Sequence, residues 1–259
     1  MNLAAAWRLV LAGAALVLVA GCATVPGATA VAQPSNPDPW ERFNRKVFDF
    51  NERVDELVLK PVATTYRNVV PALVRQGVSN VLGNIGDVWS AANHLLQGKV
   101  HHGLDMGMRV LTNTVFGLGG LLDPASEMGL VKRSEDFGQT LGRWGMGPGP
   151  YVVLPLLGPS SLRDGSAFLL DRQFAPSALG ENYRQSLGIA AVEVIDVRTG
   201  LLDAGKLLND VALDKYTFLR QVYLSRRLDA VYDGAPPMET FQDEPAEPPT
   251  PAPVKPAPR

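Results

Sequence analysis

The sequence predicts a single, all-helical domain interrupted by irregular loops rich in glycine, proline and apolar residues. In several segments apolar residues recur at alternating steps of three and four, the period of an amphipathic helix. No convincing run of strand-like alternation is found. The most irregular stretch, residues 135–165, combines seven glycines and four prolines with a largely apolar run at residues 151–157. An irregular apolar backbone must be buried in protein or rest against lipid, so we expect the flanking helices to be arranged around it.

Length and composition fit one large domain and exclude several classes of function. The chain has 259 residues, of which 46% are hydrophobic, enough to build a real core. Its formal net charge of −2 gives no basic footprint for nucleic acid. One cysteine and three histidines exclude an internal disulfide and argue against a Cys/His zinc site. We expect no metal, no cofactor and no nucleic-acid partner.

Residues 1–21 have the pattern of an export signal. Arg8 precedes an apolar segment, residues 9–20, that is too short to span a membrane in the mature protein. The segment ends in Val19-Ala20-Gly21-Cys22, which resembles a bacterial lipobox. In a lipobox, cleavage precedes the cysteine and the thiol is lipidated. The alternative is an ordinary signal followed by an accidental cysteine.

The lone cysteine, Cys22, falls at the position that a lipobox requires, so we expect it to be the lipid anchor. Residues 22–37 are small and contain proline, which suits a tether. Ala23 follows the cysteine, whereas an aspartate there often marks inner-membrane retention in the lipoproteins that this segment resembles. Its absence favours the outer membrane.

The helical body is expected over residues 38–233. Asp38-Pro39-Trp40-Glu41 predicts a helix start in which Asp38 caps, Pro39 takes the first position and Glu41 completes a capping box. The apolar residues that follow fall on one helix face, which we interpret as facing the core: Phe43, Val47, Phe50, Val54 and Leu57.

Proline and glycine delimit the helices that come next. Residues 71–82 and 87–96 are predicted to be short helices separated at Gly83 and Gly86. Residues 99–116 form a longer pattern with one apolar face: Val100, Leu104, Met108, Leu111 and Val115. Gly103 and Gly107 in this segment permit close approach of another helix. Beyond the irregular stretch, helices are predicted over residues 162–174, 182–197, 201–211 and 215–232.

From residue 234 onward the chain is rich in proline and glutamate and shows no periodicity. Such a segment has too little apolar material to pack. Residues 234–259 are therefore predicted to be a disordered tail that is dispensable for function.

The sequence contains no complete catalytic or nucleotide-binding motif. Residues 200–207 nearly match a P-loop, but Leu207 stands where Ser or Thr must hold magnesium. His101, His102 and Asp105 lie within little more than one helical turn and could bind a metal or supply a base. Solvated residues at the start of a helix explain them better.

Seven segments, taken in order, carry a resemblance to a known family: residues 38–44, 60–63, 78–84, 93–98, 109–123, 137–142 and 149–165. Among them are Asp38-Pro39-Trp40-Glu41-Arg42-Phe43-Asn44 and Asn93-His94-Leu95-Leu96-Gln97-Gly98. Each motif is modest, but their order and spacing together are specific and extend over residues 38–234. By these segments the chain resembles the MlaA/VacJ family of outer-membrane lipoproteins.

The resemblance implies a ring-like helical protein in the inner leaflet of the outer membrane, enclosing an amphipathic channel. It implies removal of phospholipids misplaced in the outer leaflet, which keeps the membrane's lipid asymmetry. The implied partners are phospholipid, a trimeric porin, and a periplasmic lipid carrier that serves an inner-membrane ABC transporter. A charged head group crosses hydrocarbon only at great cost, and a polar path through protein lowers that cost without breaking a bond.

Two other functions stay open. A lipoprotein phospholipase could use His94 or the pair His101 and His102. A purely structural lipoprotein could tether porin or cell wall.

We expect two glycine stretches, residues 117–120 and 138–149, to shape the lipid passage, because glycine lets the backbone approach lipid or another helix closely. The alternative is that these glycines only end helices. Arg163 and Asp164 could form a surface pair or line a polar passage. The candidate passage residues are Gly117, Gly119, Gly120, Gly145, Gly147, Gly149, Tyr151, Arg163 and Asp164.

Overall fold

A computed structural model describes residues 37–237 of the chain. The predicted signal peptide, Cys22, the tether up to residue 36 and the tail from residue 238 lie outside the described residues.

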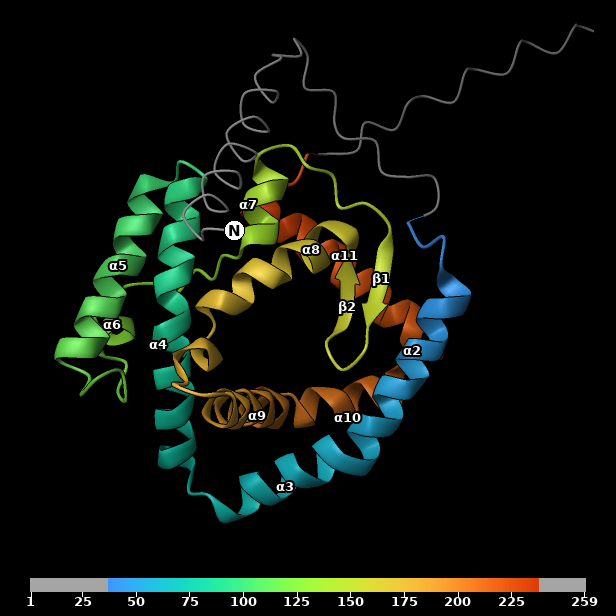
Figure 1. The fold of residues 1–259 in the computed structure, drawn as a ribbon, viewed down its shortest axis with the longest axis horizontal. Helices are drawn as coiled ribbons and strands as arrows, with labels where there is room; N and C mark the ends of the chain where they lie inside the picture. The colour runs from blue at the N-terminus through green and yellow to red at the C-terminus, as the bar shows by residue number, and fades with distance from the viewer. Residues whose placement is uncertain (1–36, 238–259) are drawn as a thin grey trace, which may run out of the picture. The chain divides into compact units, whose positions relative to one another are not determined.

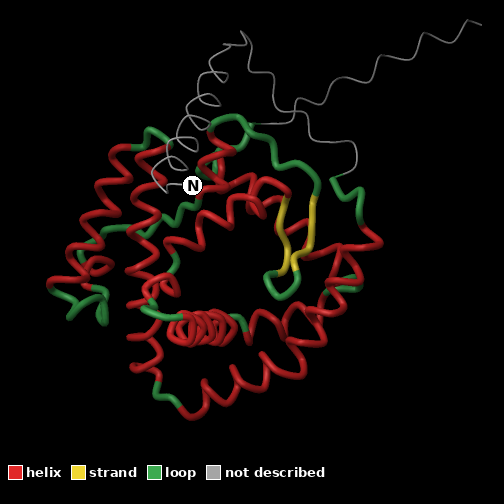
Figure 2. The backbone as a smooth tube through the Cα atoms, viewed as in Figure 1, coloured by secondary structure: helices red, strands yellow, loops and turns green. Residues whose placement is uncertain are grey.

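Helices make up most of the described residues, and a two-stranded hairpin is added to them (Figures 1 and 2). In chain order the elements are α2 (Glu41–Val54), η1 (Asp55–Leu59), α3 (Lys60–Val69), α4 (Ala72–Leu96), α5 (Val100–Val115), α6 (Pro124–Glu127), α7 (Phe137–Arg143), β1 (Tyr151–Leu154), β2 (Gly158–Ser161), α8 (Leu162–Asp171), η2 (Arg172–Phe174), η3 (Pro176–Leu179), α9 (Tyr183–Gly200), α10 (Leu202–Val211) and α11 (Lys215–Val231).

The all-helical prediction is wrong at the hairpin. β1 and β2 pair antiparallel, with Tyr151 opposite Ser161 and Leu154 opposite Gly158. Burial alternates along β1, because Tyr151 and Val153 are buried while Val152 and Leu154 are partly exposed. All four residues of β1 are apolar, so this alternation leaves no mark in the sequence. The turn places Leu156 and Gly158 at positive φ, which favours glycine.

The predicted break inside residues 71–96 is also wrong, because α4 is continuous through Gly83 and Gly86. A glycine inside a helix costs about 1 kcal/mol relative to alanine, which tertiary contacts can outweigh. The Lys132 Nζ donates to the Gly83 carbonyl at 3.3 Å and pairs with the Asp87 carboxylate at 2.8 Å. These contacts hold the helix at the place where its sequence is weakest.

The predicted capping box does not form at the start of α2. Trp40 occupies the N-cap position without a side-chain cap, and the Glu41 carboxylate instead accepts from Arg45. Asp38 is buried and accepts hydrogen bonds from Asn44, Tyr216 and Arg220. Its carboxylate therefore ties the start of the domain to α11 instead of capping a helix.

The elements close into a circuit of contacts (Figure 1). α2 packs on β1, β2 packs on α8 and α11, and α11 packs on α7. α7 packs on α4, α4 on α9, and α9 on α3, which returns to α2 through η1. Segments far apart in the sequence are thereby brought together, and the hairpin lies between the first helix and the last.

Much of the apolar face predicted to point to the core is exposed. Phe43 and Phe50 on α2 and Leu57 in η1 are 57%, 50% and 78% exposed, whereas Asn44 is completely buried. The predicted apolar face of α5 is likewise more than half exposed at all five positions. The interpretation of this face as core-facing is therefore wrong at Phe43, Phe50 and Leu57, whereas Val47 is partly buried and packs against the small apolar core.

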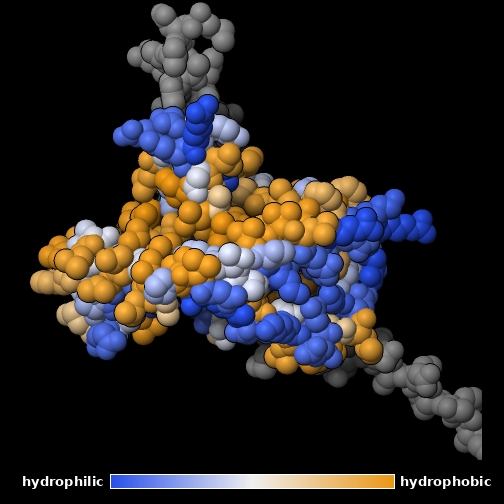
Figure 3. Space-filling view, turned by 90° about the horizontal axis from the view of Figure 1, so that it is seen from below, coloured by the Kyte–Doolittle hydropathy of each residue, from blue (hydrophilic) through white to orange (hydrophobic). Residues whose placement is uncertain are grey.

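Apolar side chains gather instead on the outside of the domain. On the face shown in Figure 3, hydrophobic residues form a continuous band beside a hydrophilic region. No helix among residues 37–237 is long and apolar enough to cross a membrane. An exposed apolar area of this kind marks a contact with lipid or with another protein.

Polar side chains hold α4, α5 and the loop after α5 together. The buried Arg109 donates to both carboxylate oxygens of Asp123, at 3.0 and 3.1 Å, and lies 3.6 Å from the Asp87 carboxylate. Asn113 also donates to Asp123. Close packing adds to this, because a Cβ on Gly103 would lie 2.7 Å from the Leu95 side chain, whereas Gly107 faces open space.

We predict that Asn44→Ala lowers the free energy of unfolding by about 2–4 kcal/mol. The Asn44 side chain donates to Asp38 and to the Tyr151 carbonyl, and accepts from the Val153 N–H. Alanine removes all three bonds, including the one that the Asn44 oxygen makes with the buried Val153 N–H, while Asp38 keeps its bonds to Tyr216 and Arg220. Unfolding followed by circular dichroism in detergent micelles measures the loss.

The control is Phe43→Ala on the exposed face of the same helix, with an expected change below about 1 kcal/mol. Equal losses at the two positions would contradict the observed burial pattern.

Candidate functional site: a cavity with one apolar and one polar wall

A cavity of about 220 Å³ lies beside the hairpin, where α7, α8 and α11 meet it. Its lining residues are Asp136, Leu154, Leu157, Pro159, Ser160, Asp164, Phe168, Asp171, Tyr223 and Arg227. The hairpin, the N-cap of α7, α8 and α11 all contribute.

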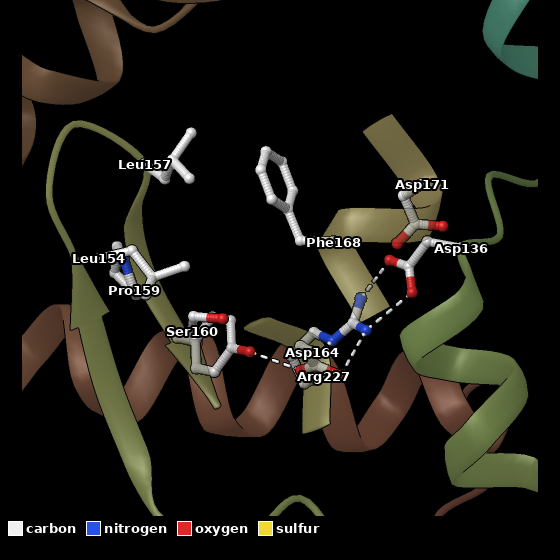
Figure 4. A pocket seen from close by; sticks show the side chains of 10 residues that line it. Asp136, Leu154, Leu157, Pro159, Ser160, Asp164, Phe168, Asp171 and Arg227 are labelled. Atoms are coloured by element: carbon white, nitrogen blue, oxygen red, sulfur yellow. Dashed lines mark hydrogen bonds and ion pairs between the residues drawn. The ribbon is translucent and has the colours of Figure 1, made fainter. Parts of the chain in front are cut away.

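The two kinds of side chain occupy different parts of the cavity (Figure 4). Leu154, Leu157 and Pro159 come from the hairpin and lie on one side. Asp136 and Asp171 lie on the opposite side, with Phe168 between the two. The cavity is therefore amphipathic, as a site for a molecule with a charged end and an apolar end must be.

Arg227 organises the polar wall. Its guanidinium donates to both oxygens of Asp136, at 2.6 and 2.9 Å, and to both oxygens of Asp164, at 2.9 Å each. Asp164 also accepts from Arg163 at 2.8 Å and from the Tyr223 hydroxyl at 2.5 Å. These bonds join α7, α8 and α11 into one cluster.

The cluster keeps its carboxylates ionised. Burial alone would raise the pKa of Asp164, but the hydrogen bonds and charge of Arg227, with those of Arg163 and Tyr223, hold this pKa at about 2. The pKa of Asp136 is lowered in the same way, since Arg227 and the Gln139 N–H outweigh its burial. Burial and the Asp164 charge raise the pKa of Tyr223, so its hydroxyl stays protonated and donates.

Asp171 behaves differently from the other two carboxylates. Burial raises its pKa, and hydrogen bonds from the Trp89 indole and the Phe137 N–H offset this only in part. The two donors lie 2.7 and 2.9 Å from the same oxygen, Oδ1.

Local sequence explains how the polar residues are placed. Ser161 caps α8 by accepting from the Asp164 N–H at 3.1 Å, which starts the helix at the end of β2. Asp136 caps α7 by accepting from the Gln139 N–H at 2.8 Å, and its carboxylate also binds Arg227. The starts of two helices therefore present carboxylates to α11, the N-cap Asp136 of α7 and the first-turn Asp164 of α8.

Of the predicted passage residues, Asp164 lines this cavity and the others do not. Arg163 is buried behind it, so the interpretation of Arg163 and Asp164 as a surface pair is wrong. Tyr151 is 1% exposed and packs in the small apolar core with Val153 and Tyr216.

The predicted glycines lie at turns. Gly119, Gly120, Gly145 and Gly149 have positive φ, and a Cβ on Gly117 would lie 2.3 Å from the Asn113 carbonyl oxygen. Such conformations end a helix or turn the chain, which favours the alternative that these glycines only end helices. A role for Gly147 and the other five glycines in a lipid passage stays a prediction.

Of the ten residues that line the cavity, Asp164 alone is predicted from the sequence as a site residue. Tyr223 and Arg227 are four residues apart and so share a helix face, which is the one signal that the sequence offers for them. The other lining residues come from segments whose proximity depends on the closure of the circuit.

None of the three histidines lines this cavity. His94 is completely buried, its Nε2 lies 3.1 Å from the Arg133 carbonyl oxygen, and burial lowers its pKa. The His101 side chain is 87% exposed, with its Nε2 3.7 Å from Asp105. Among residues 37–237 no group of three or more His, Cys, Asp or Glu residues could hold a metal ion.

Comparison with known proteins decides the family. A family model described as "MlaA lipoprotein" matches residues 36–230. The chain belongs to the MlaA lipoprotein family. The match includes every described helix and strand except Val231, the last residue of α11, and so contains all the residues that line the cavity.

MlaA relatives from two bacteria are similar over most of their length. The intermembrane phospholipid transport system lipoprotein MlaA of Escherichia coli K12 is 36% identical over 213 residues, 81% of this chain and 82% of the relative. Its namesake from Haemophilus influenzae is 30% identical over 222 residues, 84% and 88% of the two chains.

A solved structure is also similar. It comes from work on the structural basis for maintenance of bacterial outer-membrane lipid asymmetry. It is 37% identical with a TM-score of 0.67, and covers 75% of this chain and 98% of that one.

We predict that Asp164→Asn destabilises the protein at neutral pH and that this effect disappears in acid. The folded pKa of Asp164, about 2, is below the unfolded value of about 4. Its stabilising contribution is therefore complete above about pH 4 and is lost as the pH falls toward 2. The difference in unfolding free energy between wild type and variant, measured from pH 7 to pH 2, should shrink in that window.

Asp210→Asn, at an exposed site on α10, is the matched control and should differ little from wild type at every pH. A difference for Asp164→Asn that did not change with pH would show that the ionised cluster does not stabilise the fold.

Proposed function

We propose that the protein is an outer-membrane lipoprotein that removes misplaced phospholipid from the outer leaflet and passes it inward, maintaining lipid asymmetry. The single observation that carries the proposal is the amphipathic cavity in a domain that exposes a broad band of apolar side chains. The named relatives support it, since their printed names describe intermembrane phospholipid transport. Membership of a family of transport lipoproteins also argues against an enzyme.

The two walls suit the two ends of a phospholipid. Ionised Asp136, Asp164 and Arg227 offer the head group a polar surface, which lowers the cost of removing it from water. Leu154, Leu157 and Phe168 offer the acyl chains an apolar surface. At about 220 Å³ the cavity is smaller than the usual pocket for a small molecule, roughly 300–1,000 Å³, so it fits part of a lipid at a time.

The exposed apolar faces of α2 and α5 suit a position against lipid at the periplasmic leaflet of the outer membrane. Cys22 would add a covalent anchor, since acyl chains on the cysteine insert into that leaflet. In the mature wild-type protein, mass spectrometry should find Cys22 acylated, and Cys22→Ser should leave an uncleaved precursor. An unmodified Cys22 in mature protein would contradict the anchor.

The proposed direction of transport implies two partners. A trimeric porin would hold the protein in the outer membrane, and a periplasmic carrier of an ABC transport system would accept the lipid. The circuit of helices supports a ring around an amphipathic channel, with the cavity as one part of its wall.

A phospholipase finds no support in the described residues, because His94 is enclosed and accepts or donates only within the protein. A purely structural role would leave the amphipathic cavity without a function. It predicts that deletion leaves the lipid composition of the outer leaflet unchanged.

We predict that Leu157→Trp blocks lipid removal without unfolding the protein. Leu157 lies in the hairpin turn and lines the cavity, so a larger side chain would occupy space that the acyl chains need. In cells lacking the native gene, this variant should leave outer-leaflet phospholipid close to the deletion level. Protein abundance and melting temperature should match wild type.

Leu187→Trp on α9 is the matched control, because Leu187 is also 55% exposed but does not line the cavity. It should restore asymmetry fully. If Leu157→Trp restores asymmetry as well as Leu187→Trp does, the cavity is not part of the lipid path.

A further inference from the structure

We propose that the cavity selects phospholipids by head-group charge, and that Asp171 accepts the ammonium of an amine-bearing head group such as ethanolamine. The inference rests on the proposed function, because it concerns the lipid that would enter the same cavity.

The charges that line the cavity favour a cation. Three carboxylates, Asp136, Asp164 and Asp171, face it, together with one guanidinium, that of Arg227. Arg163 contacts Asp164 from behind and does not line the cavity. The lining is therefore net negative, and it repels an anionic head group more than a zwitterionic one.

Arg227 has little capacity left for a lipid phosphate. Its Nε and Nη2 donate to Asp164, and its Nη1 and Nη2 donate to Asp136. Four of its five N–H groups are used in this way. A phosphate could bind in the usual bidentate manner only by displacing a carboxylate.

Asp171 is the carboxylate with unused capacity. Both of its hydrogen bonds reach Oδ1, from Trp89 Nε1 and from the Phe137 N–H. Within residues 37–237 no hydrogen bond reaches Oδ2, and no arginine, lysine or histidine forms an ion pair with this side chain.

The orientation of Asp171 is fixed. The Trp89 indole that binds it stacks on Phe174 with ring centroids 3.9 Å apart and planes at 4°. Asp171 is also held at the end of α8 by the backbone of α7. A fixed, partly buried carboxylate with a free oxygen is a suitable partner for an ammonium group, which carries three donors.

The rest of the cavity agrees with this placement. Phe168 lies one helical turn before Asp171 on α8 and points into the cavity (Figure 4). Leu157 lies beyond it, on the side away from Asp171. A lipid with its ammonium on Asp171 would therefore lay the start of its chains along Phe168 toward the hairpin.

The test compares two lipids that differ only in the ammonium. Full-length lipoprotein in non-ionic detergent micelles is titrated with fluorescent phosphatidylethanolamine and with its N-acetylated form, which has the same chains and phosphate. Wild type should bind the amine form about fivefold more tightly, as expected for a partly solvated ion pair.

Asp171→Asn should lose most of this preference, although Asp136 and Asp164 still leave the lining net negative. Its amide oxygen can still accept from Trp89 and Phe137, so the variant removes charge and leaves the local bonds in place. Asp210→Asn makes the same charge change at an exposed site on α10 and should keep the wild-type preference.

Equal binding of the two lipids by wild type would overturn the inference while leaving lipid transport intact. A full preference retained by folded Asp171→Asn would overturn the role of Asp171. Failure of wild type to bind either lipid would contradict the proposed function itself. If Asp171→Asn does not fold, as judged by circular dichroism and melting temperature, the wild-type comparison decides alone.

Discussion

Hydrogen bonds and ion pairs between buried polar side chains hold the described domain together. Asn44 joins α2 to the hairpin, Arg109 joins α5 to the loop that follows it, and Arg227 joins α11 to α7 and α8. A buried polar group without a partner costs about 1–3 kcal/mol, so each of these residues requires its own partners to be in place. The bonds of Asn44 and Arg227 therefore help to specify how the elements of the circuit meet.

The same arrangement connects stability to function. Because Asn44 and Arg109 bind polar partners inside the domain, the apolar faces of α2 and α5 are free to face outward, toward lipid. Because the hairpin packs between α2 and α11, its apolar turn lines the same cavity as the ion cluster of Asp136, Asp164 and Arg227. One cavity then has walls of both kinds. A phospholipid needs both at once, and no bond has to be broken to move it.

Much of the helical structure could be predicted from the sequence, since α5, α8, α10 and α11 follow apolar periodicity closely. The side of α2 that is buried could not be predicted. Periodicity shows only that polar and apolar residues occupy different faces, and in water the apolar face is normally the buried one. Here Phe43 is exposed and Asn44 is buried. The hairpin could not be predicted because all of β1 is apolar and so shows no alternation. Arg227 could not be linked to Asp136, which is 91 residues away, without knowing that the circuit closes.

The most direct measurement of this account is a nitroxide scan along α2 in proteoliposomes, with labels at successive positions from 42 to 50. The rate at which the label collides with oxygen reports its exposure to lipid. The rate at which it collides with a polar relaxation agent reports its exposure to water. If the apolar face of α2 contacts lipid, both collision rates vary with the helical period and peak at different positions. Oxygen access should be highest at Phe43 and Phe50, polar access highest at Arg42 and Asp49, and both lowest at Asn44. Strong polar access at Phe43 and Phe50, with oxygen access highest at Asn44, would contradict it.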